Sequence, residues 1–432
     1  MKTATSASGA PWYRSSTVHI FAGLALGVLM GGFLPQNQYP FAYELFRFFS
    51  KAFIALIKSV IVPILVATIV TGIAQTGDVK SVGRMGARAL VYFEVVTTFA
   101  LFIGLAIANT LRPGDGLPLR ADAHTALAVP QTGWETALHA FPSNFFKHAA
   151  EGDILPVVVF ASLFGVALTR AGERAKPVFA FFDGLTHVMF RYTDMVMSLT
   201  PIGVFGAMAY NVSHMAAGQE VGGHVIRGWP AVAHLLAQYA RVVGSLYLAL
   251  LCLFLFVFVP VMLITRTPVV GFLRAIREPA ITAFSTASSE AALPKLLDEM
   301  VRFGVPRRVA SFVIPAGYSF NLDGSTLYLV LASLTIAQAA GRTMTFTQQV
   351  AMMVTFMLTS KGVAGVPRAT LVIIAGTCAS FNLPGEAGVA MLLAVDEVMD
   401  MARTAINVTG NGLASVVIAK WDGSFGTERE AP

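Results

Sequence analysis

Long apolar runs separated by short polar segments dominate the pattern of hydrophobic and polar positions along this chain. In the first part of the sequence the runs span residues 16–34, 41–74, 86–111, 153–170, 178–211 and 234–265. Each is about as long as, or longer than, the roughly 20 residues that a helix needs to cross a bilayer. The runs lack the alternation of membrane β-strands, so the pattern predicts six membrane-spanning helices.

Beyond the sixth run the pattern changes, because small and turn-forming residues interrupt the apolar segments. The interrupted segments span 269–301 and 344–383, and the long apolar runs that follow them span 309–340 and 386–420. The interruptions read STASSEAALP at Ser285–Pro294 and SKGVAGVP at Ser360–Pro367. A helix, a break, a helix and a full span, occurring twice, predict two repeated units with discontinuous helices. Non-helical backbone at membrane depth must line a cavity or be buried in protein, so both breaks are expected near one site.

The run 309–340 contains a break of its own, SFNLDGS at Ser319–Ser325. Asn321, Asp323 and Gly324 disfavour a continuous helix. The freed carbonyl groups and the Asp323 carboxylate offer hard oxygen ligands for a small cation. A simple turn between two short helices is the alternative, but the apolar sequence continues on both sides of the break.

Polar side chains follow one face of the last apolar run, in DEVMDMARTAINVTGN. At about 100° per residue, six polar side chains fall within an arc of roughly 100°. They are Asp396, Asp400, Arg403, Thr404, Asn407 and Asn411. Two aspartates and an arginine at mid-span oppose insertion by roughly 9 kcal/mol together, so this helix needs partners. A soluble amphipathic helix is the alternative, and the flanking apolar residues favour an intramembrane binding stripe instead.

Composition and charge support an integral membrane protein. Of 432 residues, 55% are hydrophobic and 12% are charged, against about 25% charged in a typical soluble protein. The net charge of +6 comes from basic residues in short loops: Lys80, Arg84 and Arg88, then Arg170, Arg174 and Lys176, then Arg266, Arg274 and Arg277. This positive-inside pattern places both termini in the cytoplasm, and it argues against a nucleic-acid partner.

A few other polar or reactive residues need an interpretation. Glu94, in the third run, is either a structural partner of a basic residue or a proton carrier. His139 and His148 lie in the long polar connection 112–152 and are interpreted as surface histidines, since no second ligand pair has metal-site spacing. Cys252 and Cys378 are interpreted as buried thiols without a disulfide.

The chain from about residue 270 to 422 resembles the glutamate transporter family, the dicarboxylate/amino acid:cation symporters. Four motifs in order carry the resemblance: STASSEAALP, SFNLDGSTLY, SKGVAGVP and DEVMDMARTAINVTGN. The first six spans match more loosely, in count, length and the VYFEVVTT segment. The forms SSE, YFE, SKG and NVTGN look most like the bacterial proton/glutamate symporters.

The resemblance implies an all-α polytopic fold with eight transmembrane helices and two re-entrant helical hairpins in inverted repeats, assembled as a homotrimer in the inner membrane. It divides the chain into a cytoplasmic tail at 1–15, six spans at 16–265, a transport core at 266–422 and a cytoplasmic tail at 423–432. Spans 1, 2, 4 and 5 would form a trimerisation scaffold. Spans 3 and 6, both hairpins and spans 7 and 8 would form a moving transport domain, with the second hairpin as its outer gate.

The resemblance also assigns substrate-binding residues. Arg403 matches the arginine that holds the side-chain carboxylate, and Asp400 matches the acid that takes the α-amino group. The other positions that match are Thr404, Asn407 and Ser325 around the substrate, and Ser289 and Val366 at the hairpin tips. Plain C4-dicarboxylates need no partner for an ammonium group, so Asp400 favours glutamate or aspartate.

The coupling ion is where the chain departs from the sodium-coupled relatives. Asn411 stands where they have an aspartate, and Phe93 and Val96 stand where they have tyrosine and threonine, which leaves Thr97 as the only match in that span. Lys361 and Val363 occupy the place of sodium-binding groups in the second hairpin, where the lysine would supply fixed positive charge.

We therefore predict proton coupling, with Glu94 and Glu290 as hypothetical proton carriers whose pKa is raised by burial. Sodium stays open, because Asn321, Asp323 and Asn407 would form a residual cation site. The groups expected around the coupling ion are Thr97, Gly317, Asn321, Asp323 and Asn411, with Lys361 near them.

The predicted function is secondary active uptake of acidic amino acids by alternating access, without a cofactor or enzymatic activity. The nearest alternative is a sodium-coupled or C4-dicarboxylate symporter of the same fold. An intramembrane hydrolase is remote, because all eight histidines lie at or before His234, and Ser360 and Lys361 are adjacent residues that seldom face one another. A channel is also disfavoured, because the paired opposite charges Asp400 and Arg403 suit a zwitterion better than a stream of one ion. Arg368 is expected to contact headgroups rather than substrate.

Overall fold

A computed structural model of the chain describes residues 16–75, 79–117, 119, 141, 143–151, 154–221, 224–360 and 369–426. The predicted positions that lie outside these residues are the tail 1–15, His139, Lys361, Val363, Val366 and Arg368. The described chain is mostly helical, as predicted. Its strands are a short antiparallel pair, β1 (Gln219–Val221) and β2 (His224–Ile226).

The first six apolar runs form helices close to the predicted bounds. They are α1 (Ser16–Phe33), α2 (Pro40–Gln75), α3 (Val79–Leu111), α6 (Ile154–Ala171), α7 (Lys176–Ser198), α8 (Thr200–Ala217), α9 (Trp229–Leu253) and α10 (Val259–Ile264). The 3-10 turn η2 (Gly172–Ala175) joins α6 to α7, and the π-helical segment η3 (Phe254–Phe258) joins α9 to α10. The short helix α5 (Phe145–Glu151) lies in the polar connection before α6. The fifth run is two helices, because the chain bends by 47° between α7 and α8. Pro201, in the first turn of α8, explains the break, since proline suits a helix start and disrupts a helix interior.

The second half forms eight shorter helices. They are α11 (Val269–Thr286), α12 (Ser289–Phe303), α13 (Arg307–Phe320), α14 (Asp323–Ala339), α15 (Phe346–Thr359), α16 (Ala369–Ser380), α17 (Gly385–Leu393) and α18 (Asp396–Trp421). The predicted breaks fall between α11 and α12 and between α13 and α14. The last run also has a break that was not predicted, between the end of α17 at Leu393 and the start of α18 at Asp396. Asp396 and Glu397 lie in the first turn of α18, where the helix dipole favours acidic side chains.

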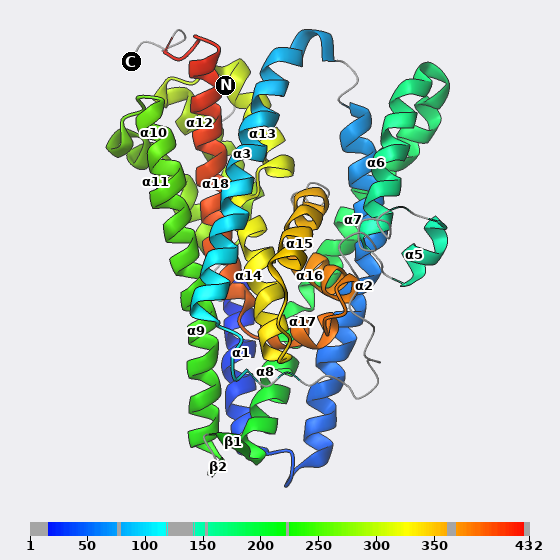
Figure 1. Cartoon of the computed structure of the whole chain (residues 1–432), viewed down its shortest axis with the longest axis vertical. Coiled ribbons are helices and arrows are strands. Elements are labelled where there is room, and N and C mark those ends of the chain that lie inside the picture. The colour runs from blue at the N-terminus through cyan, green and yellow to red at the C-terminus, as the bar shows by residue number, and fades with distance from the viewer. Residues whose placement is uncertain are drawn as a thin grey trace, which may run out of the picture.

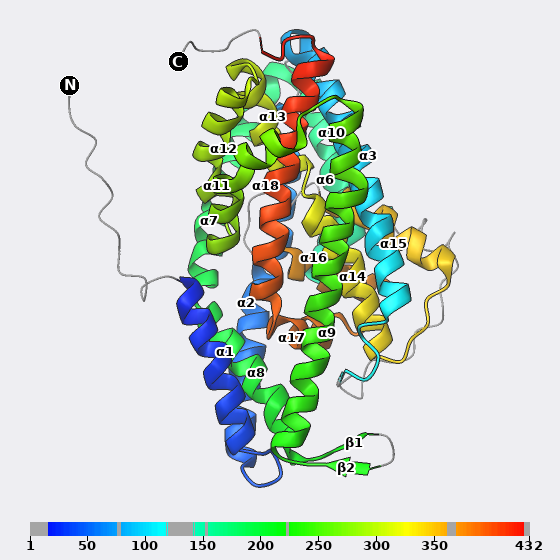
Figure 2. The same ribbon diagram turned by 90° about the vertical axis from the view of Figure 1, so that its left-hand side faces the viewer.

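The helices pack in two groups that meet along one side (Figures 1 and 2). In one group α8 packs against α1 and α2, and α2 also packs against α6 and α7. In the other group α18 lies at the centre and packs against α11, α12, α13, α14 and α9. The groups touch where α8 packs against α9 and α17, where α16 and α17 pack against α2, and where α15 and α16 pack against α6.

Glycines allow α8 to approach its neighbours closely. A Cβ atom at Gly31 of α1 would collide with the backbone oxygen of Ala209, and one at Gly203 of α8 would collide with the ring of Phe53 on α2. Small residues at such contacts are typical of helix packing in membranes. The α1–α2–α8 group is therefore built around backbone contact.

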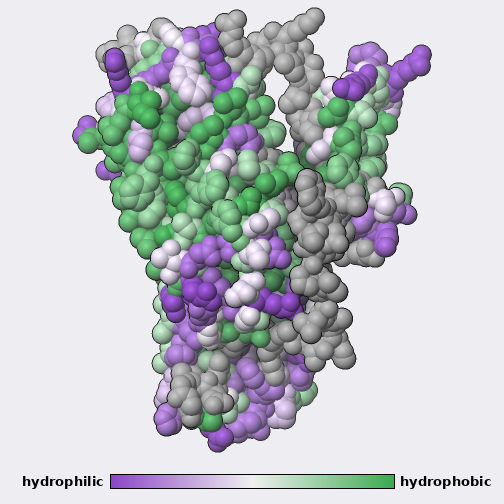
Figure 3. Space-filling view, in the orientation of Figure 1, coloured by the Kyte–Doolittle hydropathy of each residue, from purple (hydrophilic) through white to green (hydrophobic). Residues whose placement is uncertain are grey.

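The apolar surface fits a multi-pass membrane protein. Among the described residues, three helices are long and apolar enough to cross a membrane, Met85–Leu111, Trp229–Ile264 and Arg307–Ala339, and the bent pair formed by Val159–Ser198 and Thr200–Ala217 would be a fourth. Figure 3 shows a broad apolar surface over the region of α10, α11 and α3. Ile264, at the end of α10, and Phe256, in η3, are 81% and 71% exposed. Large apolar patches of this kind are unfavourable in water.

The structure corrects two of the minor interpretations. His148 is buried in α5, which packs against α6, so it is not a surface histidine. Both cysteines are free as predicted, but only Cys378 is buried and Cys252 is half-buried.

Candidate functional site

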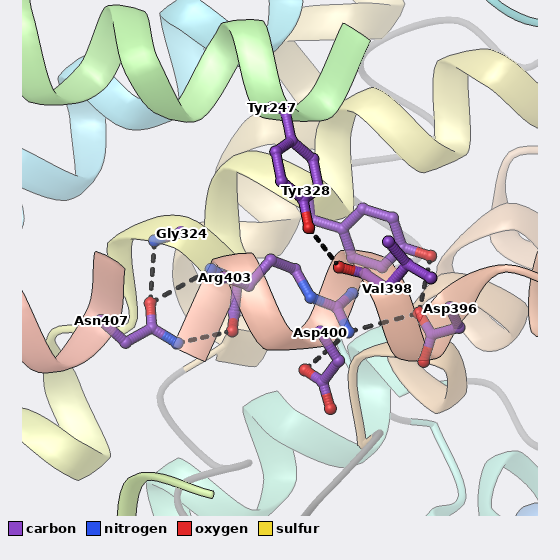
Figure 4. Close-up of polar contacts among 9 residues, drawn as sticks. Tyr247, Gly324, Tyr328, Asp396, Val398, Asp400, Arg403 and Asn407 are labelled. Atoms are coloured by element: carbon purple, nitrogen blue, oxygen red, sulfur yellow. Dashed lines mark hydrogen bonds and ion pairs between the residues drawn. The ribbon is translucent and has the colours of Figure 1, made fainter. Parts of the chain in front are cut away.

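The charged residues of α18 form a buried cluster near the start of the helix (Figure 4). Arg403 Nη2 donates to Asp400 Oδ1 at 2.7 Å and lies 3.2 Å from Asp396 Oδ1. Arg403 and Asp396 are 0% exposed, and Asp400 is 8% exposed. Burying an unpaired guanidinium would cost several kcal/mol, so the two carboxylates are what allow Arg403 to lie there. The predicted polar stripe therefore faces protein.

Two tyrosines that the sequence analysis missed complete this cluster. The ring of Tyr328, on α14, lies 3.9 Å from the guanidinium carbon of Arg403, and its hydroxyl donates to Asp396 Oδ1 at 3.0 Å. Tyr247, on α9, donates to the backbone oxygen of Val398 at 2.9 Å and so fixes the first turn of α18 (Figure 4). Stacking on an aromatic face and a second hydrogen bond to its partner hold the arginine in one orientation. Both tyrosines lie in apolar runs, where the only sign of a polar role is that their hydroxyl groups need a hydrogen-bond partner when buried.

Asn407 joins α18 to the break between α13 and α14. Its Oδ1 accepts hydrogen bonds from the backbone nitrogens of Gly324 at 2.8 Å and Ser325 at 3.3 Å, and its Nδ2 donates to Ser325 Oγ at 2.9 Å. The amide thus caps the first turn of α14, whose N–H groups have no partner within the helix. A Cβ atom at Gly324 would meet the backbone of Arg403, which explains the glycine. Thr404 is buried on the same face, so four of the predicted substrate positions lie together around Arg403.

A second polar cluster lies farther along α18, where four segments meet. Asn321 Nδ2 donates to Asn411 Oδ1 at 3.0 Å, and Thr97 Oγ1 donates to Asp323 Oδ1 at 3.3 Å. All four side chains are buried. A Cβ atom at Gly317 would collide with Asn411 Oδ1, so only glycine leaves room for that amide. The cluster brings together five predicted coupling residues, which are Thr97, Gly317, Asn321, Asp323 and Asn411.

This second cluster has the chemistry of a site for a small hard cation. It offers carboxylate, amide and hydroxyl oxygens around Asp323, which are the donors that such ions prefer. The described residues hold no group of three or more His, Cys, Asp or Glu side chains that could bind a transition metal. Asn407, which was expected here, is instead engaged with Ser325 and Gly324. Phe93 and Val96 are buried next to Thr97 along α3 and present only hydrocarbon.

The other predicted site residues that the structure describes are Glu94, Glu290 and Ser289. Glu94 is half-buried on α3, and Glu290 is exposed in the first turn of α12. Ser289 begins α12, directly after a turn in which Ala287 has a left-handed φ of 47°. Ser288 Oγ caps the helix by accepting from Ala291 N at 3.3 Å. Proton transfer by the two glutamates therefore stays a prediction.

Comparison with known proteins agrees with the motifs. Residues 17–421 match the family described as the Sodium:dicarboxylate symporter family. The chain is 38% identical over 415 residues to the proton/sodium-glutamate symport protein of Bacillus subtilis (strain 168), covering 94% of this chain and 92% of that protein. It is 36% identical over 419 residues to the protein of the same name in Bacillus caldotenax, covering 95% of each chain.

A similar relative carries a different substrate name. The chain is 37% identical over 430 residues to C4-dicarboxylate transport protein 2 of Polaromonas naphthalenivorans (strain CJ2), covering 97% of this chain and 91% of that protein. The predicted family and the predicted symport activity are confirmed, and the protein is a transporter rather than an enzyme. This chain belongs to the sodium:dicarboxylate symporter family.

Proposed function

We propose that this symporter takes up glutamate or aspartate rather than plain C4-dicarboxylates. The observation that carries the proposal is the buried pair of opposite charges, Arg403 and Asp400, 2.7 Å apart on one face of α18. In a substrate with a second carboxylate and an ammonium group, the carboxylate would pair with Arg403 and the ammonium with Asp400. A dicarboxylate would bring negative charge against Asp400 in a site with little water to screen it.

We propose protons as the coupling ion. Asn411 supplies a neutral amide to the second cluster, and Phe93 and Val96 add no oxygen to it, so few charged ligands remain for a sodium ion. Sodium is the second candidate, because Asp323 and its amide and hydroxyl neighbours still form an oxygen-rich buried site. The names of the Bacillus relatives include both ions.

The proposed architecture has eight membrane spans and two re-entrant hairpins. Helices α11, α12, α15 and α16 have 18, 15, 14 and 12 residues, fewer than the roughly 20 needed to cross a bilayer. α11 and α12 also pack against each other, as do α15 and α16, which supports two hairpins that enter and leave on the same side. Basic residues between the spans support cytoplasmic termini in the inner membrane.

The proposed assembly is a homotrimer built on the α1–α2–α8 group with α6 and α7. Large apolar side chains remain exposed on its helices, including Phe41 (83%) and Phe48 (64%) on α2 and Met195 (70%) on α7. Contact between subunits would cover part of this surface. The group around α18 would then move as the transport domain.

We assign the present conformation to a state that is open towards the cytoplasm. α16 and α17 pack against α2, whereas α11 and α12 pack mainly on α18 and α13 and leave their own turn half-exposed. The pathway to Arg403 on the α11–α12 side would therefore be the one that opens. If the α18 group moved relative to α2 and α8, α11 and α12 would come to pack against α2 and α8, where α16 and α17 pack now.

Uptake into proteoliposomes tests the proposal. Purified protein would be reconstituted and given an inward proton gradient or an inward sodium gradient, with labelled glutamate, aspartate or succinate outside. We expect accumulation of glutamate or aspartate under the proton gradient without sodium, and little accumulation of succinate. Succinate uptake equal to aspartate uptake would contradict the substrate assignment, and uptake that requires sodium would contradict proton coupling.

A further inference from the structure

The seven residues that close α18 and follow it, Lys420–Gly426, fold back over the ends of several helices. We call this segment the C-terminal strap. Figures 1 and 2 both show it at the end of the molecule where α3 and α13 begin. Lys420 Nζ donates to the backbone oxygen of Thr265, after α10, at 2.8 Å, and the backbone nitrogen of Gly426 donates to the oxygen of Gly304, after α12, at 2.8 Å.

Aromatic packing fixes the middle of the strap. The ring of Phe425 lies 5.9 Å from that of Phe303, which in turn lies 6.1 Å from the buried ring of Phe272. The ammonium of Lys420 lies 4.9 Å from the Phe425 ring centre. Gly304 has a φ of 117°, which favours glycine, and a Cβ atom there would touch Phe425. The strap is therefore packed against the start of α11 and the end of α12.

Asp422 joins the strap to two helices at once. Its Oδ1 lies 3.4 Å from Arg88 Nη1 on α3, and its Oδ2 lies 3.3 Å from Arg308 Nη2 on α13. Arg88 also donates to the backbone oxygen of Trp421 at 2.8 Å. Single exposed ion pairs contribute little, typically about 0–1 kcal/mol. Here the Asp422 carboxylate bridges α3 and α13, and the Arg88 guanidinium binds both that carboxylate and the adjacent carbonyl of Trp421. These contacts hold α3, α13 and α18 at a set spacing.

The three helices that meet at Asp422 carry every part of the second polar cluster except Asp323, which begins α14. α3 contributes Thr97, α13 contributes Gly317 and ends at Phe320, directly before Asn321, and α18 contributes Asn411. From Arg88 to Thr97 is nine residues, or about 13 Å along the helix. Between them the buried Tyr92 ring packs edge-on against Trp421, with ring centres 6.2 Å apart. A shift of α3 at its Arg88 end is thus carried to the hydroxyl of Thr97.

We propose that Asp422 is a positioning residue for cation coupling, which acts by fixing α3 and α13 against α18 so that Thr97, Asn321 and Asn411 keep their spacing around Asp323. This inference rests on the proposed coupling role of that cluster. Asp422 pairs with Arg88 and Arg308 and belongs to neither polar cluster, so it would act through the helices. Its loss is expected to change the ion dependence of transport more than the maximal rate.

The test compares Asp422→Asn, Asp422→Glu and, as the matched control, Asp298→Asn, an exposed acid on α12. In proteoliposomes, protons and sodium are each titrated at saturating aspartate. We expect Asp422→Asn to raise the half-saturating concentration of the coupling ion by about three- to tenfold with maximal rate within about twofold. Asp422→Glu restores the carboxylate and should behave like the unchanged protein, as should Asp298→Asn.

Hydrogen exchange of residues 88–97 gives a second readout that does not depend on transport. Faster exchange in Asp422→Asn, and not in Asp298→Asn, is expected because α3 loses its tie to α18. Unchanged exchange together with an unchanged half-saturating concentration would overturn the inference while the proposed function stands. If the unchanged protein accumulates no acidic substrate, the proposed function fails, and exchange in α3 still decides whether Asp422 positions that helix.

Discussion

Arg403 donates to Asp400 across 2.7 Å, one helical turn apart, in a site where the arginine has no contact with solvent. With Asp396, the cluster holds two carboxylates and one guanidinium, so it carries one net negative charge when all three are ionised. An acidic amino acid adds a further negative charge to this low-dielectric site. Entry of a cation with the substrate offsets that charge, which is a physical reason for symport.

Replacing Arg403 should abolish uptake of acidic substrates. In Arg403→Ala the site loses its only described partner for a substrate carboxylate, and the buried Asp396 and Asp400 are left without the guanidinium that compensates them. We expect labelled aspartate uptake to fall at least about 100-fold, consistent with a cost of about 3–5 kcal/mol for breaking a buried pair. Arg342→Ala, at an exposed arginine between α14 and α15, is the control. Unchanged aspartate uptake by Arg403→Ala in a correctly assembled protein would refute its role.

Replacing Asp400 should change which substrate is selected. Asp400→Asn removes the negative charge that pairs with an ammonium group and repels a second carboxylate, so the ratio of aspartate to succinate uptake should fall by at least about tenfold. Asp396→Asn is the matched control, because Asp396 lies against Tyr328 and is fully buried. Competition between labelled aspartate and unlabelled succinate measures the ratio. An equal shift in both variants would argue that the effect is a general loss of charge.

Tyr328 should contribute to substrate affinity through Arg403. Tyr328→Phe keeps the ring under the guanidinium and removes the hydrogen bond to Asp396, so we expect the KM for aspartate to rise by about threefold to tenfold, or roughly 1 kcal/mol. Tyr328→Leu also removes the cation–π contact and should raise KM further. A double-mutant cycle with Asp396→Asn provides the check, since the hydroxyl and the carboxylate share one hydrogen bond. Additive effects on KM in that cycle would show that the hydrogen bond between Tyr328 and Asp396 does not contribute to aspartate binding.

The sequence predicted those features that depend on local pattern. Apolar length located the spans, and helical periodicity placed Asp400, Arg403 and Asn407 on one face. The sequence did not reveal Tyr328 as the partner of Arg403, because the two residues are about 75 positions apart in the chain and one tyrosine in an apolar run resembles any other. The break between α17 and α18 was missed because Ala394 and Val395 carry no turn signal. The C-terminal strap was missed because its contacts with α3 and α12 are all tertiary.

Glycines at the second cluster offer a test of its role that leaves every polar group in place. A Cβ atom at Gly317 would collide with Asn411 Oδ1 and must push that amide away from Asn321. We expect Gly317→Ala to weaken the apparent affinity for the coupling ion by at least about fivefold, with a cost in stability of about 1–3 kcal/mol from overpacking. Gly244→Ala, on α9, is the control, because nothing lies within 4 Å of its added Cβ atom. Titration of protons and sodium at saturating aspartate gives the affinity, and thermal unfolding gives the stability. Equal ion affinity in the two variants, despite a lower stability for Gly317→Ala alone, would mean that the cluster supports the fold and does not bind the coupling ion.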